Sequence, residues 1–243
     1  MCTLAVALHA HSRWPVLVAA NRDERLGRPA EGWALRQPPA GPRHVAPRDL
    51  VGGGTWIGLS ATGLFVGLTN FFAGAGFPDR TRQSRGALVM RALAHRDAAS
   101  ARAEIEGTEA SAYNPFHLVV ADARTAFLWR YDGRAAELLP LGPGLHVVTE
   151  TDHRGQSARG DRVRAHWPPE PDAPALREVL VQHAPEPREG TCIHLDPHYG
   201  TRSSAILRIA QEVGASDLLV ATGHPCTARF EDRADLIASI ARP

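Results

Sequence analysis

Residues 1–8, Met1-Cys2-Thr3-Leu4-Ala5-Val6-Ala7-Leu8, carry the pattern on which the predicted fold depends. Its apolar residues 3–8 predict a buried strand, which would hold the amino terminus in a sheet. Removal of Met1 would give Cys2 a free α-amine beside its thiol. Because an α-amine titrates at about 7.7–8.0, it can accept the thiol proton near neutral pH. The stretch therefore predicts a nucleophile and its base on one residue; a cysteine that only fills core space is the alternative.

A second strand and a polar run follow. Residues 15–20 are apolar and predict a buried strand, which a short connection, residues 9–14, would pair with the first. The strand ends in Asn21-Arg22-Asp23-Glu24-Arg25, which the hairpin would return to Cys2. There an arginine can lower the pKa of the thiol, and a carboxylate can orient the α-ammonium. A solvated turn with local ion pairs is the alternative.

The next segments predict a loop, a hairpin and a second loop. Residues 28–50 are rich in Pro, Gly and Arg and predict a long surface loop. Residues 52–60 and 64–70 predict a β-hairpin, and no helix follows their glycines as a dinucleotide-binding fingerprint requires. Asn70 ends this hairpin as a candidate oxyanion donor or turn cap. The apolar residues 71–78 predict a pocket wall made by Phe71, Phe72 and Phe77.

The rest of the chain is expected to form helices and strands that follow one another in groups along the sequence. Helices are expected over residues 84–96, with Ser84 as N-cap, and over 98–105, 160–167, 173–183 and 232–240; strands are expected over 116–121, 125–131, 136–139, 145–149, 191–195, 203–209, 218–221 and 226–231. This order favours an α+β layered sandwich over a βαβ fold. The length of 243 residues favours a single domain over residues 1–243.

Composition excludes several classes of function. All 27 basic residues are arginine, so there is no lysine for a Schiff base, pyridoxal phosphate or a Walker A loop. The arginines are dispersed and nearly balance 26 acids, which argues against nucleic-acid binding. The absence of a long apolar run and of the features of a secretory signal argues against stable membrane insertion and favours a cytoplasmic location. An odd number of cysteines, 3, argues against a disulfide framework.

One cluster carries the residue types of a metal site. Cys192 and His194 would share a face of a strand, with His183 and His198 nearby in the sequence. The spacing lacks the paired Cys or His clusters of common zinc sites. The sequence therefore predicts no metal and no resident cofactor.

Six motifs occur in order along the chain. They are Met1-Cys2, Asn21-Arg22-Asp23-Glu24, Gly53-Gly54-Thr55-Trp56-Ile57-Gly58, Leu68-Thr69-Asn70, Tyr113-Asn114-Pro115-Phe116 and Tyr199-Gly200-Thr201-Arg202-Ser203. Together they resemble the NRDE family, also called the transport and Golgi organisation 2 family. That family is similar to the N-terminal nucleophile hydrolases, in particular to the cysteine branch that contains penicillin V acylase and bile salt hydrolase. The resemblance implies a four-layer αββα sandwich.

The resemblance also implies site residues. Cys2 would be the nucleophile, with Arg22 and Asp23 beside it and Asn70 holding the oxyanion. The residues expected to contact substrate are Asn21, Glu24, Trp56, Phe71, Phe72, Glu150 and Arg202.

One position departs from the family pattern. Residues 147–150 are Val-Val-Thr-Glu, where most members carry Gly-Leu-Ser-Asn. Glu150 has only acceptor oxygens unless it is protonated, so it cannot donate to an oxyanion. A late arginine of the acylase branch would correspond to Arg159 or Arg162.

Two functions stay open at this point. The first is an N-terminal cysteine hydrolase or acyltransferase, acting on an amide or thioester of an apolar acyl group. The second is a non-catalytic carrier of haem or an acyl-lipid such as acyl-CoA on the same fold, since animal and yeast members of the family are linked to haem trafficking and acyl-lipid handling. The expected partner is accordingly a small acyl substrate or haem, and the oligomeric state stays open.

Overall fold

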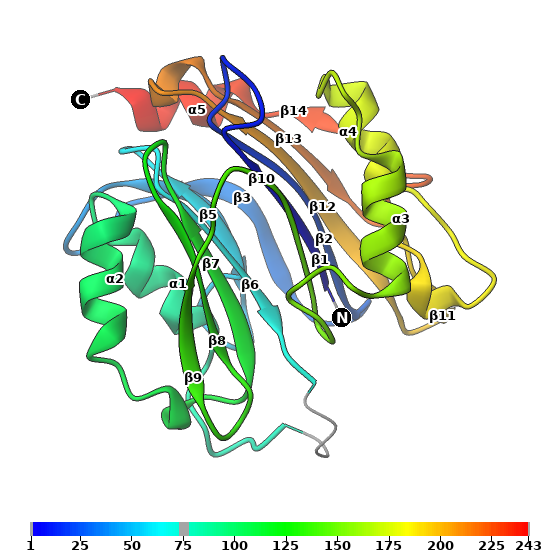
Figure 1. Cartoon of the computed structure of the whole chain (residues 1–243), viewed down its shortest axis with the longest axis horizontal. Helices are drawn as coiled ribbons and strands as arrows, with labels where there is room; N and C mark the ends of the chain where they lie inside the picture. The colour runs from blue at the N-terminus through cyan, green and yellow to red at the C-terminus, as the bar shows by residue number, and fades with distance from the viewer. Residues whose placement is uncertain (1, 73–77, 243) are drawn as a thin grey trace.

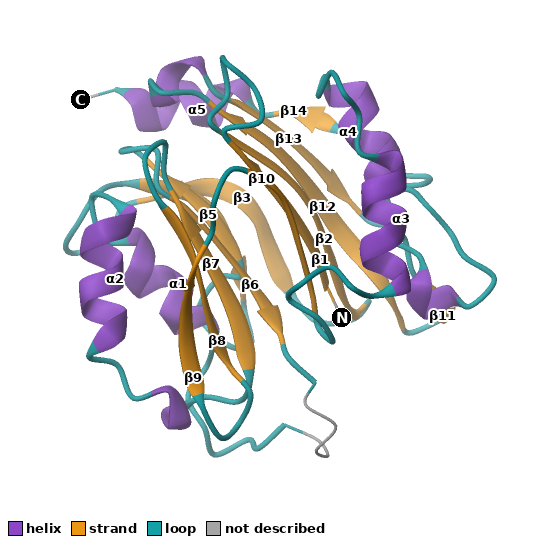
Figure 2. Cartoon of the chain, in the orientation of Figure 1, coloured by secondary structure: helices purple, strands orange, loops and turns teal. Residues whose placement is uncertain are grey.

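Two antiparallel sheets packed face to face form the centre of the molecule. The computed structural model describes residues 2–72 and 78–242, and in this part of the chain each sheet has 7 strands. Figures 1 and 2 show helices over the outer face of each sheet. The expected α+β fold with four αββα layers is confirmed.

The first sheet combines strands from both ends of the chain. Its order is β10 (Gly144–Thr149), β1 (Cys2–Leu8), β2 (Val16–Arg25), β12 (Tyr199–Ile209), β13 (Asp217–Thr222) and β14 (Glu231–Asp232), and β11 (His194–Asp196) also pairs with β12. The first strand therefore has a hydrogen-bonded neighbour on each side, β2 and β10. This double pairing fixes the start of the chain inside the sheet.

The second sheet follows the sequence in order. Its strands are β3 (Ala30–Arg36), β4 (His44–Asp49), β5 (Ile57–Ser60), β6 (Phe65–Asn70), β7 (Phe116–Ala121), β8 (Ala126–Tyr131) and β9 (Ala136–Pro140). Every neighbouring pair is antiparallel.

Helices cover both outer faces. The second sheet carries α1 (Gly86–Leu93) and α2 (Ala98–Glu106), and the first carries α3 (Ala158–His166) and α4 (Ala173–Leu180). The last helix, α5 (Ala234–Ala241), contacts β13, β3 and β4, so it joins one margin of both sheets. Short 3-10 turns occur at Ala110–Ala112, Pro187–Glu189 and Val213–Ala215. None of the helices in the described residues has the length and hydropathy needed to cross a bilayer.

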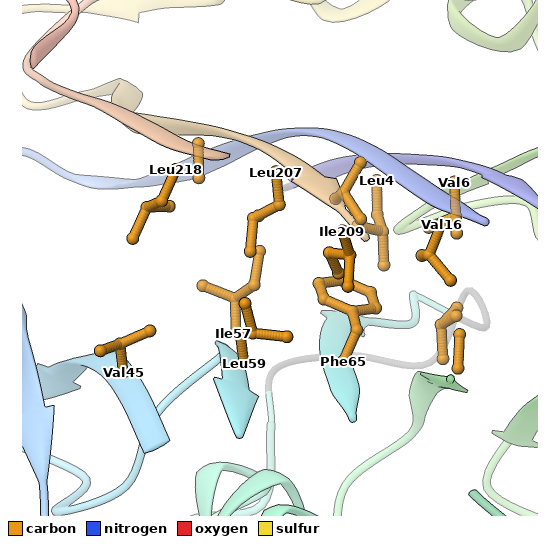
Figure 3. Close-up of a cluster of buried hydrophobic side chains, with 14 of the residues drawn as sticks. Leu4, Val6, Val16, Val45, Ile57, Leu59, Phe65, Leu207, Ile209 and Leu218 are labelled. Carbon is orange, nitrogen blue, oxygen red and sulfur yellow. The ribbon is translucent and has the colours of Figure 1, made fainter. Parts of the chain in front are cut away.

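Alternation along the strands builds the core. In β1, Leu4, Val6 and Leu8 lie in the cluster between the sheets, whereas Ala5 packs under the helices of the first sheet. Figure 3 shows side chains from both sheets meeting in this cluster, among them Phe65 of the second sheet. Because the period of a strand is 2, Cys2 has the same parity as Leu4 and faces the space between the sheets.

Glycine permits a close approach at two points. A Cβ on Gly67 of β6 would lie 2.9 Å from Leu4 Cδ2, so the sheets come together beside the start of β1. A Cβ on Gly54 would lie 2.4 Å from the carbonyl carbon of Gly86, the first residue of α1. These contacts set the distance between β1 and β6 and the position of α1.

Several local predictions are wrong. Residues 28–50 contain β3 and β4 rather than one loop. Residues 226–231 are mostly a turn, in which Thr227 and Ala228 donate their backbone N–H groups to the His224 carbonyl. The cap of α1 is Arg85, not Ser84, and its side chain makes no capping bond. The predicted pocket residue Phe77 lies outside the described residues, as does Met1.

Candidate active site

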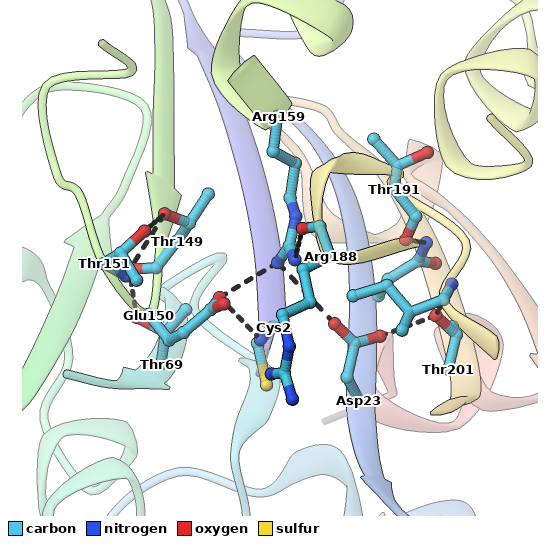
Figure 4. A network of polar contacts seen from close by, with 12 residues as sticks. Cys2, Asp23, Thr69, Thr149, Glu150, Thr151, Arg159, Arg188, Thr191 and Thr201 are labelled. Atoms are coloured by element: carbon cyan, nitrogen blue, oxygen red, sulfur yellow. Dashed lines mark hydrogen bonds and ion pairs between the residues drawn. The ribbon is translucent and has the colours of Figure 1, made fainter. Parts of the chain in front are cut away.

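Cys2 begins β1 at the end of the first sheet. Its backbone nitrogen lies 3.4 Å from Oε2 of Glu150, just after β10. Its neighbour in the β1–β2 register is Arg22, and Thr3 is paired with Thr149 on the other side. The side chain of Cys2 is half-buried. Figure 4 shows Cys2 between Glu150 and Asp23.

A buried ion-pair cluster surrounds this terminus. Arg159 of α3 donates from Nη1 to Oε2 of Glu150 at 2.9 Å and lies 3.7 Å from Oδ2 of Asp23. The side chains of Arg159 and Glu150 are each 4% exposed, and that of Asp23 is 0% exposed. Arg159 also donates to the carbonyl of Arg188. The arginine thus bridges the carboxylates on the two sides of Cys2.

Asp23 is held from β12. Thr201 donates its hydroxyl to Oδ1 of Asp23 at 2.6 Å, and the Tyr199 hydroxyl donates to the Asp23 backbone carbonyl at 3.2 Å. Burial raises the pKa of the Asp23 carboxyl from its ordinary value to about 7, although the positive charge of Arg159 opposes the shift. Asp23 can therefore change its protonation state near neutral pH.

The expected low thiol pKa is wrong for this arrangement. Burial raises the pKa of Cys2, and the charge of Asp23 acts in the same direction, while the charge of Arg22 only partly opposes them. Arg22 is instead committed to Asp49, 3.3 Å away, and to Glu24, 3.5 Å away. A nucleophilic Cys2 consequently needs a base that removes its proton.

Arg22 lies on the side of the site that faces the space between the two sheets. Its guanidinium lies 4.1 Å from the centroid of the Trp56 ring, and the Arg22 side chain is 7% exposed. Asp49 also accepts from Arg28 at 2.8 Å, and Glu24 lies 3.7 Å from the same Arg28 nitrogen. Glu24 and Trp56, which were expected to contact substrate, therefore contact Arg22, and Arg22 is the neighbour of Cys2 in the β1–β2 register.

A bulge re-aims the backbone beside the site. In the β12–β2 register Thr201 pairs with Asp23 and Ser203 with Arg22, so Arg202 is the extra residue. Bulges of this kind turn a strand locally and often occur next to active sites. Burial lowers the pKa of Arg202, and the charge of Arg22 contributes to the shift. The predicted residue Arg202 thus lies close to Arg22.

The predicted Asn21 has a structural position. Its Nδ2 donates to the carbonyls of Leu180 and Thr191 at 2.9 and 2.7 Å, and its Oδ1 accepts from Ser204 at 2.5 Å. Both ends of the amide are engaged. Asn21 therefore connects β2 to the end of α4, to Thr191 and to Ser204 within β12.

The end of β6 approaches the site from the second sheet. Asn70 is half-buried and is paired with Phe116 of β7. Two residues later, the backbone N–H of Phe72 donates to the Glu150 carbonyl at 2.7 Å, which brings this segment beside Glu150. The ring of Phe71 packs on His117, with ring centroids 4.5 Å apart.

Two cavities flank the site. A cavity of about 1000 Å³ is lined by Arg25, Phe72, Thr149, Glu150, Thr151, Ser157, Ala158, Arg159, Arg188, Glu189, Leu195, His198 and Tyr199. A much smaller one, about 20 Å³, lies between the sheets and is lined in part by Cys2, Arg22, Trp56 and Thr69. Glu150 and Arg159 therefore separate the Cys2 terminus from a space large enough for a substrate.

Of the two alternatives Arg159 and Arg162, Arg159 occupies the cluster, whereas Nε of Arg162 points to the carbonyl of Glu189 on the surface. Sequence reasoning missed three further residues of the site. Burial lowers the pKa of Arg85 to about 10, and the Cys2 charge opposes the shift, so Arg85 is within electrostatic range of Cys2. Thr201 and Tyr199 belong to the motif at residues 199–203, and membership of that motif is the feature of the sequence that points to their role.

The family follows from comparison with known proteins. The sequence profile described as Transport and Golgi organisation 2 matches residues 1–168. The chain belongs to this family. A relative within the transport and Golgi organisation 2 family, the mouse Transport and Golgi organization 2 homolog, is 31% identical over 117 residues. That match covers 46% of this chain and only 40% of the mouse protein.

Solved structures of other proteins share the fold of this chain. The Caenorhabditis elegans ortholog of N-acylethanolamine-hydrolyzing acid amidase superposes with a TM-score of 0.61 at 14% identity, covering 98% of this chain and 97% of that chain. A cysteine-to-alanine variant of the conjugated bile acid hydrolase from Clostridium perfringens gives 0.59 at 9% identity, with 97% and 93% covered. The expected N-terminal nucleophile hydrolase-like fold is confirmed.

Proposed function

We propose that this protein is an N-terminal cysteine hydrolase or acyltransferase that acts on an amide or thioester of an acyl group. The supporting observation is the backbone nitrogen of Cys2, held 3.4 Å from a buried carboxylate that is itself paired with Arg159. After removal of Met1, that nitrogen becomes the α-amine. The site then carries a thiol, a base and a counter-charge in one place.

The reaction would proceed in two halves. The α-amine takes the proton of the Cys2 thiol while the sulfur attacks the acyl carbonyl carbon, and the carbonyl oxygen becomes an oxyanion. Asn70 and nearby backbone N–H groups would donate to that oxygen. The C–N or C–S bond then breaks, and the α-ammonium returns its proton to the leaving group. Water, or another acyl acceptor, releases the acyl group from Cys2 by the same steps in reverse.

Glu150 acquires a role in this scheme that does not require it to donate. Its carboxylate would accept from the α-ammonium that forms when the thiol loses its proton, and Asp23 would add negative charge on the other side. Arg159 keeps both carboxylates in position. With glutamate at the position where the family resemblance expects asparagine, residue 150 would interact with the α-amine base instead of donating to the oxyanion.

The large cavity supports an acyl compound with a polar end. Phe72, Leu195 and Tyr199 supply apolar surface, whereas Arg25, Arg188 and Glu189 supply charged groups on the same lining. This mixture fits an amphipathic substrate whose acyl chain is joined to a polar or charged group. The two fold relatives are, by name, hydrolases of N-acylethanolamines and of conjugated bile acids, which is consistent with acyl chemistry.

The test combines mass and turnover. Intact-mass measurement of protein made in cells should show Cys2 as the first residue, and a panel of acyl amides and acyl thioesters should be hydrolysed. Cys2→Ala should abolish turnover, whereas Arg162→Ala on the exposed face of α3 should retain it. Retention of Met1 in the purified protein, or full turnover by Cys2→Ala, would sink the proposal.

A carrier function is the second candidate, because the same cavity supports it. Its volume of about 1000 Å³ accommodates a large ligand, and His198 and Tyr199 on its lining are residue types that ligate haem iron. Titration with haem and with acyl-CoA should distinguish the candidates. Binding that is lost in His198→Asn but kept in Cys2→Ala, with no turnover across the panel, would favour the carrier.

A further inference from the structure

Four metal-ligating side chains meet on the first sheet, outside the candidate active site. They are His183, Cys192, His194 and Cys226, and one ligand atom from each lies within 4.8 Å of all the others. We infer that they form a closed, tetrahedral binding site for a divalent zinc ion. This inference departs from the expectation of no metal, and it does not depend on the proposed enzyme function.

The distances fit a zinc ion. His194 Nε2 lies 3.5 Å from Cys192 Sγ and 3.4 Å from Cys226 Sγ. With Zn–S of about 2.3 Å and Zn–N of about 2.0–2.1 Å, two ligands at the tetrahedral angle are separated by about 3.5 Å. Both sulfurs therefore already have the required spacing from the His194 nitrogen. The ring of His183 lies next to that of His194, with centroids 5.2 Å apart, and its ligand atom is within 4.8 Å of the other three.

The chemistry of the set selects zinc. Two thiols and two imidazoles are the ligands of many structural zinc sites, and soft sulfur ligands disfavour magnesium and calcium. Four protein ligands fill the coordination shell, so no position stays open for a water or substrate. The site is therefore structural, unlike a catalytic zinc centre.

The backbone around the ligands is already fixed. The Cys192 N–H donates to the Gln182 carbonyl at 3.0 Å, which brings Cys192 beside the residue that precedes His183. Cys226 lies in the turn closed by the hydrogen bonds to the His224 carbonyl. The His224 ring stacks on His194, with centroids 3.8 Å apart, and supports the imidazole at the centre of the cluster.

The sequence grouped His183, Cys192 and His194 but missed Cys226, which is 32 residues from His194 along the chain. Cys192 precedes β11 instead of alternating with His194 along a strand, and Cys226 lies in the turn after β13. His198, which the sequence grouped with these residues, lines the large cavity instead. Pairing of β11 with β12, and of β12 with β13, brings the ligands together.

The metal would stabilise the segment that contains Ile193 and supports Asp23 through Thr201. The Ile193 N–H donates to Thr201 Oγ1 at 2.8 Å, and Thr201 donates in turn to Asp23. Figure 4 shows Thr191 and Thr201 on this side of Asp23. A zinc ion bound to Cys192 and His194 would hold the segment that positions these groups.

Metal content and spectroscopy test the site directly. Protein expressed in zinc-supplemented medium should contain about one zinc ion per chain, and the cobalt-substituted protein should show the intense visible absorption of a tetrahedral cobalt thiolate. Cys192→Ser and Cys226→Ser should lose most of the metal and the absorption. His198→Asn, which changes a histidine between β11 and β12 that is not in the set, should keep both.

Measurements on the unaltered protein keep the proposal falsifiable if a variant fails to fold. Chelator treatment should lower the melting temperature, and added zinc should restore it. A zinc content under about a tenth of an ion per chain, with no cobalt thiolate spectrum, would overturn the site. An intact mass showing a Cys192–Cys226 disulfide would overturn it as well, since bonded sulfurs cannot act as thiolate ligands.

Discussion

Among single residues, Glu150 sets the charge beside the Cys2 nitrogen. Its carboxylate is buried against the Cys2 nitrogen and against Arg159, so its negative charge is held where an N-terminal ammonium would form. A neutral amide at this position would leave the arginine with less compensation. A buried charge that loses its partner is costly, so the residue cannot be exchanged freely.

Glu150→Gln should lower the pKa of the α-amine in the processed protein, because the carboxylate no longer favours the ammonium. The chain contains no lysine, so an amine-selective reagent modifies only the amino terminus, and its rate against pH gives this pKa directly. An α-amine pKa that is equal in the two proteins would contradict the role given to Glu150.

The same substitution should also reduce the free energy of unfolding. Breaking a buried ion pair typically costs about 3–5 kcal/mol. Glu106→Gln is the matched control, because it removes an exposed pair with Arg102 at 2.8 Å, and such pairs contribute about 0–1 kcal/mol. Denaturant unfolding of both variants measures the difference.

Asp23→Asn should change how stability depends on pH. The pKa of Asp23 is about 7 in the folded protein, whereas an unfolded aspartate titrates at about 3.9. Between these values the folded state binds one more proton, so its stability falls as pH rises, by up to about 1.4 kcal/mol per pH unit. The asparagine variant lacks this fall.

The measurement for Asp23→Asn is urea unfolding of both proteins from pH 4 to pH 8. The variant should gain stability relative to the unaltered protein up to about pH 7, and the difference should then level off. A difference that is the same at every pH would show that Asp23 does not titrate in this window.

At the scale of elements, the position of α1 depends on a contact between two glycines. The backbone N–H of Thr55, the residue after Gly54, also reaches the Gly86 carbonyl at 3.4 Å. Gly54→Ala would place its Cβ 2.4 Å from the backbone of Gly86 and should destabilise the protein by about 1–3 kcal/mol, the usual cost of overpacking. Gly32→Ala has no atom within 4 Å and should have little effect. Thermal unfolding compares the two.

Most elements could be predicted from sequence, and the failures have physical reasons. The apolar strands and their alternation were evident, since one or both faces are buried. The strand β3 was missed because a bulge between Glu31 and Ala34 breaks its alternation, and several of its side chains are exposed. Residues 226–231 have strand-forming side chains but are held in a turn by the His224 carbonyl.

The candidate site also has residues that the sequence could predict and residues that it could not. Cys2, Arg22 and Asp23 lie on one hairpin, so local pairing was enough to bring them together. Arg159 comes from a helix on the outer face of the first sheet, and the packing of α3 on β10 brings it to Glu150. Contacts of this kind leave no periodicity in the sequence, so the family resemblance could only leave Arg159 and Arg162 as alternatives.

At the scale of the whole molecule, the two sheets share one apolar core, so we expect them to unfold together. Side chains of both sheets form this core, and α5 contacts strands of both. Native-state hydrogen exchange should give the central strands β2 and β7 the same opening free energy. Protection that is lost in one of these strands at clearly lower denaturant concentration would show two independent units.

The order of the strands has a consequence for biosynthesis. The second sheet follows the sequence, so its strands can pair as each leaves the ribosome. The β1–β2 hairpin is made before its outer partners, which are residues 144–149 and 199–209. For most of translation both edges of this apolar hairpin are therefore open, and unpaired edges of this kind attract other chains. The nascent protein should depend on chaperones that shield residues 2–25 until residues 199–209 have been made.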